Sequence, residues 1–115
     1  HLVWCFLSKN QLSGPLPSEL GNLGSLNRLW LQSNTLSGSI PPELGKLASL
    51  HEITLSFNKL NGPLPRELGN LAVAEYLQLS ENSLSGSLPL ELGRLGLLRK
   101  LSLAFNQLNG SLPTE

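Results

Sequence analysis

Leucine recurs along this chain in a pattern that repeats every 24 residues, with polar residues, glycine and proline between the leucines. The apolar positions of the second repeat are Leu20, Leu23, Leu26, Leu29, Leu31, Leu36 and Ile40, and the equivalent positions elsewhere are almost all leucine. A repeat of this size cannot enclose its own apolar side chains. The pattern therefore predicts a solenoid, in which successive turns stack on one shared core.

An asparagine marks the same point of every repeat, and a glycine follows it four positions later. The asparagines are Asn10, Asn34, Asn58, Asn82 and Asn106. Because a primary amide both donates and accepts hydrogen bonds, we expect these side chains to satisfy backbone groups where the chain turns, and to form a ladder in the stacked repeats. The glycines are expected to adopt a positive φ or to permit close backbone approach.

Each repeat also predicts one short strand and one short helical segment. Leu29 and Leu31 alternate with Arg28, Trp30 and Gln32, which is the pattern of a strand with one face in the core. One such strand per repeat predicts a parallel sheet. The Pro-x-Glu-Leu-Gly sequence that follows predicts one to two helical turns, with proline at the start, glutamate on the helix dipole and glycine as the stop signal.

The consensus Leu-x-x-Leu-x-Leu-x-x-Asn-x-Leu, continued by Leu-Ser-Gly-Ser-Ile-Pro-Pro-Glu-Leu-Gly-Lys-Leu at 36–47, resembles the plant-type leucine-rich repeat. The resemblance covers 1–115 as one domain of five repeats, the first truncated, without the paired cysteines of the family's terminal caps. It implies an α/β repeat solenoid: a right-handed coil with a concave parallel β-sheet, short 3₁₀ helices on the convex side and a second set of short β segments.

This family includes receptor-like kinase ectodomains and secreted inhibitors of cell-wall-degrading enzymes, and its concave strand residues bind peptides, proteins or glycans. The resemblance therefore implies a protein- or peptide-binding recognition module of a receptor-like or secreted signalling protein. A glycan is the next candidate ligand. The implied location is extracellular or at the cell surface.

All six aromatic residues lie outside the leucine columns, where exposed rings supply the anchors that binding surfaces favour. We expect Trp4, Phe6 and Trp30 to cluster at the N-terminal end of the sheet. In the alternative interpretation, a further N-terminal segment covers them. Phe57 and Phe105 directly precede the asparagine, and we expect these two rings to support the loop.

Charged residues occupy two adjacent columns on the later strands, at His51, Glu52, Glu75, Arg99 and Lys100. They form either exposed cross-strand ion pairs or a patch that orients a charged partner. The predicted ligand-binding residues are Trp4, Phe6, Arg28, Trp30, Glu52, Tyr76, Gln78, Arg99 and Lys100.

Composition narrows the class of partner. The 115 residues carry eight basic and eight acidic side chains, so the absence of net charge argues against nucleic acid or an anionic membrane surface. No apolar run is long enough to span a bilayer, and the first residues do not resemble a signal peptide. The single cysteine, Cys5, falls in a leucine column and is expected to pack in the core as an unreactive thiol.

We expect no enzyme activity, no cofactor and no metal. His51 and Glu75 are placed to meet across strands, but no nucleophile or set of metal ligands accompanies them. The sequence Asn109-Gly110-Ser111 is the one glycosylation sequon, and the alternative is that Asn109 only varies a column of small polar residues.

A structural or ice-binding repeat protein is a further alternative, because such proteins present regular rows of small hydroxyl side chains. Ser56 and Ser80 align in one row, but Gln32 and Ala104 interrupt it. The sequence therefore favours the recognition module over this class.

Overall fold

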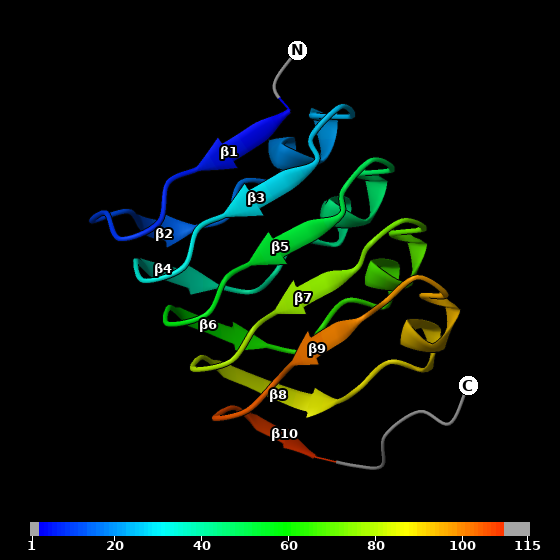
Figure 1. The fold of residues 1–115 in the computed structure, drawn as a ribbon. Coiled ribbons are helices and arrows are strands. Elements are labelled where there is room, and N and C mark those ends of the chain that lie inside the picture. The colour runs from blue at the N-terminus through cyan, green and yellow to red at the C-terminus, as the bar shows by residue number, and fades with distance from the viewer. Residues whose placement is uncertain (1–2, 110–115) are drawn as a thin grey trace.

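The computed structural model describes residues 3–109, which wind into a solenoid with two parallel sheets and a row of short helices (Figure 1). The first sheet has the order β1-β3-β5-β7-β9, with strands Trp4–Phe6, Arg28–Trp30, Glu52–Thr54, Tyr76–Gln78 and Lys100–Ser102. The second sheet has the order β10-β8-β6-β4-β2, with strands Ser13–Pro15 (β2), Thr35–Gly38 (β4), Lys59–Gly62 (β6), Ser83–Ser87 (β8) and Gln107–Asn109 (β10). The 3₁₀ helices are Ser18–Asn22 (η1), Pro42–Lys46 (η2), Arg66–Asn70 (η3) and Leu90–Arg94 (η4). The predicted repeat solenoid is thus confirmed.

Neighbouring strands of the first sheet pair in parallel and without slippage. Arg28 pairs with Glu52 and Glu52 with Tyr76, and the same offset of one repeat continues to Lys100. Side chains of one sequence column therefore stand side by side across the sheet.

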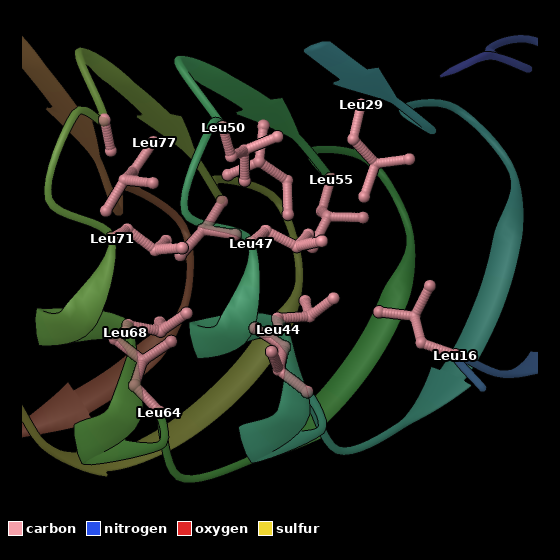
Figure 2. Close-up of a cluster of buried hydrophobic side chains, with 14 of the residues drawn as sticks. Leu16, Leu29, Leu44, Leu47, Leu50, Leu55, Leu64, Leu68, Leu71 and Leu77 are labelled. Carbon is pink, nitrogen blue, oxygen red and sulfur yellow. The ribbon is translucent and has the colours of Figure 1, made fainter. Parts of the chain in front are cut away.

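The core lies between the two sheets and the helices, and leucine fills it (Figure 2). Leu29, Leu44, Leu47, Leu50 and Leu55 from two adjacent repeats are all fully buried. Burial of one such side chain stabilises the fold by about 1.5–3 kcal/mol. None of the six aromatic side chains belongs to this core.

The asparagine ladder ties each repeat to the one before it. The Nδ2 of Asn58 donates to the carbonyl oxygens of Leu31 (3.0 Å) and Leu55 (2.9 Å), and its Oδ1 accepts from the backbone N–H of Leu36 (3.0 Å). Asn82 and Asn106 repeat this arrangement one and two turns later. Each amide therefore satisfies backbone groups of two repeats at once.

Two columns have a left-handed backbone. Gly14, Gly38, Gly62 and Gly86 have φ between 75° and 83°, as expected for glycine. The residue before each asparagine is also left-handed, with φ between 57° and 62°, although none of these residues is glycine. In two of the five repeats that residue is phenylalanine, Phe57 and Phe105.

The glycine of the helical segment is not the stop signal that the sequence indicated. Helix η2 continues one residue past Gly45, and this glycine is absent from the left-handed set. A Cβ atom at Gly45 would instead meet the backbone carbonyl oxygen of Glu67 well inside van der Waals contact. Gly21 and Gly69 have the same relation to the next helix, so glycine is required because successive helices approach closely.

Candidate binding surface

The outward side chains of the first sheet form two continuous columns, because strand residues alternate between the core and the outside. One column is Trp4, Arg28, Glu52, Tyr76 and Lys100, and the next is Phe6, Trp30, Thr54, Gln78 and Ser102. We call these two columns, together with Gln32, Ser56, Ser80, Glu75 and Arg99 next to the strand ends, the sheet face.

Three aromatic rings stack at the N-terminal end of the sheet face. The ring centroids of Trp4 and Phe6 lie 5.9 Å apart with planes 8° from parallel, and those of Phe6 and Trp30 lie 4.4 Å apart at 28°. Trp4 is 57% exposed and Phe6 is 46% exposed. We call these three rings the aromatic ladder. Stacking stabilises each pair by about 0.5–1.5 kcal/mol beyond area burial, yet the ladder still leaves two large aromatic side chains open to solvent.

Two polar atoms beside the aromatic ladder are buried without a hydrogen-bond partner among the described residues, Nε1 of Trp30 and Oε1 of Gln32. An unpaired buried donor or acceptor costs about 1–3 kcal/mol. The sequence placed Gln32 on the same face but gave no reason to single it out, because a periodic pattern does not show which polar atoms lack partners.

The middle of the sheet face is polar and partly closed. Thr54 and Ser56 are only 7% and 6% exposed, and the hydroxyl of Ser56 lies 3.1 Å from that of Ser80. These two side chains are therefore closed to a ligand, although they follow Glu52 and Ile53 on and just after the outward-facing strand β5. Tyr76 and Gln78 are half-buried and remain accessible.

Ion pairs neutralise most of the charge on the sheet face. The Nε of Arg28 lies 3.9 Å from Oε1 of Glu52, and the Nε of Arg99 lies 3.4 Å from Oε1 of Glu75. Pairs this exposed stabilise the fold by about 0–1 kcal/mol. Lys100 is exposed and forms no ion pair with any residue between 3 and 109. One uncompensated positive charge therefore remains at the β9 end.

The pairing of His51 with Glu75 that the sequence allowed is not formed. The Nδ1 of His51 lies 3.0 Å from the carbonyl oxygen of Ser49, and the carboxylate of Glu75 pairs with Arg99. Within residues 3–109, no group of three or more histidine, cysteine or acidic side chains is arranged to hold a metal ion.

Phe57 and Phe105 flank the sheet face at the loop that follows each strand. Phe57 is 57% exposed and Phe105 is 76% exposed, so the expectation that these rings support the loop is wrong. The asparagine ladder and the left-handed backbone hold the loop instead.

Cys5 lies on β1 and packs half-buried against the core leucines. Burial raises the pKa of its thiol above the ordinary value. It lines an apolar hollow of about 240 Å³ beneath β1 together with Leu7, Leu12 and Leu20.

The remaining features lie away from the sheet face. A groove of about 420 Å³ between η2 and η3 is lined by Glu43, Lys46, Glu67 and Asn70 among others. Asn109 ends β10, and the rest of its sequon lies outside the described residues. No helix between residues 3 and 109 has the length and apolar character needed to cross a membrane.

The Leucine Rich Repeat family profile matches residues 1–23, 25–47, 49–71, 74–95 and 97–115. No curated protein sequence matches the chain significantly. Among solved structures, the ectodomain of the Arabidopsis thaliana receptor kinase GASSHO1/SCHENGEN3, in complex with CASPARIAN STRIP INTEGRITY FACTOR 2, is 46% identical over 94% of this chain, with a TM-score of 0.92. The Arabidopsis receptor kinase HAESA, in complex with the peptide hormone IDA and the co-receptor SERK1, is 38% identical over 97% of the chain, with a TM-score of 0.94.

A plant ice-binding protein is 33% identical over 93% of the chain, with a TM-score of 0.81. The chain spans 13%, 19% and 34% of these three proteins respectively. The family profile and the two receptor structures agree with the repeat geometry described above. The chain belongs to the leucine-rich repeat family and is homologous to the ectodomains of plant receptor kinases.

Proposed function

We propose that the chain is a recognition module that binds a peptide or protein ligand on the sheet face, as part of a larger receptor-like protein at the cell surface. The observation that carries this proposal is the aromatic ladder, in which Trp4, Phe6 and Trp30 stack on the sheet and Trp4 and Phe6 remain open to solvent. The leucine core is complete without these rings.

Exposed aromatic side chains leave apolar area in contact with water in the free protein, and a bound ligand removes that area from water. Large aromatic residues bury much area at little conformational cost, so they dominate the energetics of interfaces. A ligand that rearranges the ladder also gains by pairing the unpartnered atoms of Trp30 and Gln32. The two receptor kinases reported above were solved with a bound peptide hormone or integrity factor, which supports a ligand of the same class here.

The test is a selection of 12-residue phage-displayed peptides on the immobilised chain, followed by titration of the selected peptides. We expect Trp30→Ala and Arg99→Ala each to weaken binding by about tenfold or more. Leu90→Ala is the matched control, since Leu90 is 78% exposed on η4, away from the sheet face. Binding that survives both sheet-face substitutions in folded protein contradicts the proposal.

The same variants distinguish a glycan from a peptide. Binding on an array of cell-wall oligosaccharides, lost with Trp30→Ala, would make a glycan the ligand of this surface.

A cell-surface location is tested on the full-length gene product. We expect protease added to intact cells to digest the repeat segment, and protection from protease contradicts that location.

Ice binding is a second candidate function, favoured by the second sheet. This sheet exposes small polar side chains on parallel strands, among them Ser13 on β2 with its pairing partner Thr35 on β4, and Ser83 and Ser87 on β8. The similarity to a plant ice-binding protein supports this candidate, whereas the exposed Lys59 on β6 interrupts the small polar residues. Thermal hysteresis of a dilute solution, abolished by Thr35→Lys, would establish ice binding; its absence removes this candidate.

A further inference from the structure

The sheet face differs in chemistry at its two ends. The β1 and β3 end carries the aromatic ladder, whereas the β9 end carries Arg99 and Lys100. Between them, β5 carries Glu52, whose charge is compensated by Arg28 of β3, and β7 carries the half-buried Tyr76 and Gln78. A ligand that covers the whole face therefore meets an apolar anchor site and, separated from it, a cationic site.

The cationic end is accessible and carries excess positive charge. The side chain of Arg99 remains 71% exposed although it approaches the carboxylate of Glu75, which is itself 31% exposed. Lys100 stands beside them and pairs with no residue in the described part of the chain. Two basic groups against one acidic group leave one positive charge on this end of the surface, which favours an anionic partner.

Strand spacing sets the distance between the two ends. Neighbouring strands lie about 4.8 Å apart, so β3 and β9 are separated by roughly 14 Å and β1 and β9 by roughly 19 Å. An extended peptide advances about 3.3–3.6 Å per residue, so the two anchoring residues of a ligand would lie about four to six positions apart, with about three to five residues between them. The register of the strands places Trp4 of the ladder and Lys100 in the same column of outward side chains across the sheet.

We propose that the ligand of the sheet face is an extended peptide segment that places an aromatic or large aliphatic side chain on the ladder and a carboxylate against Lys100 and Arg99, with about three to five residues between them. This inference rests on the proposed function and adds to it the chemistry and spacing of the ligand. The carboxylate belongs to an Asp or Glu side chain or to the C-terminus of the ligand.

The experiment uses fluorescent peptides with one tryptophan and one aspartate separated by two to nine serine or glycine residues. Both orders of the two residues are made, with amidated C-termini, and a further set carries asparagine and a free C-terminus. Fluorescence anisotropy measures Kd for each peptide. We expect the Kd to be lowest with about three to five intervening residues in one of the two orders, and about three- to tenfold higher when asparagine replaces aspartate.

Charge reversal tests the cationic site. Lys100→Glu should abolish the preference for aspartate and create a preference for lysine at the same spacing. Arg66→Glu is the matched control, because Arg66 is an exposed basic residue of η3, away from the sheet face, and it should leave the Kd series unchanged.

The outcomes separate this inference from the proposed function. If peptides bind and Trp30→Ala abolishes binding, but the Kd depends on neither spacing nor charge, the inference is wrong and the proposed function stands. If neither these peptides nor any selected peptide binds the folded chain, both fail. An optimum at about three to five intervening residues only in the free C-terminal set identifies the ligand's terminal carboxylate as the group recognised.

Discussion

At the scale of single residues, the column before each asparagine shows a conflict between the backbone and the side chain. Phe57 and Phe105 have φ of 60°, a region that bulky L-residues rarely adopt. Their rings are mostly in solvent, so little packing offsets the strain. Lys9, Ser33 and Glu81 occupy the same column, which shows that the loop does not need an aromatic residue there.

We therefore expect Phe105→Asn to stabilise the protein by about 0.5–1 kcal/mol, because asparagine tolerates the left-handed region. The gain is measured as a shift of the urea midpoint at constant slope. Phe6→Asn is the control and should give no such gain, since Phe6 has no positive φ. A loss of stability in Phe105→Asn would mean that the ring has a packing role.

Removal of an asparagine from the ladder should destabilise the protein. Asn58→Ala leaves the backbone N–H of Leu36 without its side-chain acceptor. It also removes one of the two amide donors from each of the carbonyl oxygens of Leu31 and Leu55, which keep Asn34 and Asn82 respectively. We expect a loss of about 2–4 kcal/mol in the free energy of unfolding. Asn61→Ala is matched in chemistry but exposed on β6, and it should change stability by less than about 0.5 kcal/mol. Equal effects of the two substitutions would contradict the structural role of the ladder.

Cys5 provides a prediction on pH. Because burial raises the pKa of the thiol in the folded protein, the thiolate forms at higher pH there than in the unfolded chain. Alkylation by iodoacetamide should therefore reach half its maximal rate at a higher pH in native than in urea-unfolded protein. The folded state retains the proton more strongly, so the stabilising contribution is complete below the unfolded pKa and is lost as pH rises through the folded pKa. Identical rate profiles in the two states would show that the thiol is not desolvated.

At the scale of elements, the spacing between successive helices depends on the glycine inside each one. The column Gly21, Gly45 and Gly69 allows one helix to contact the backbone of the next. The Pro-x-Glu-Leu-Gly pattern by itself indicates that this glycine terminates the helix, which the structure does not bear out. A single repeat cannot reveal the true reason, because the contact is made with the following repeat.

Gly45→Ala should cost about 1–3 kcal/mol, because the added methyl group forces the backbones of η2 and η3 apart. Gly24→Ala is the control: a Cβ there meets no atom within 4 Å, and its φ is not left-handed. It should be neutral or stabilise by about 0.4–1 kcal/mol. Urea unfolding of both variants measures the difference, and a neutral Gly45→Ala would show that the helices move apart without cost.

At the scale of the whole molecule, most of the fold follows from the sequence because the leucine period fixes which side chains point inward. The same alternation places Trp4, Phe6 and Trp30 outward on neighbouring strands. The leucine period does not determine how the outward side chains of the sheet face pack against one another. The burial of Thr54 and Ser56 depends on how side chains of neighbouring repeats pack against each other. The residue types at equivalent positions of the repeats do not show this packing.

Neighbouring repeats contact one another along the whole solenoid, so the sheet face is a continuous surface with an aromatic end and a cationic end. Amide hydrogen exchange, read by mass spectrometry with and without a selected peptide, tests whether this surface is where the ligand binds. The account predicts slower exchange in β1, β3, β5, β7 and β9 and in the residues that follow each of them, with η1 to η4 unchanged. Slower exchange confined to the helices or to the second sheet would contradict it.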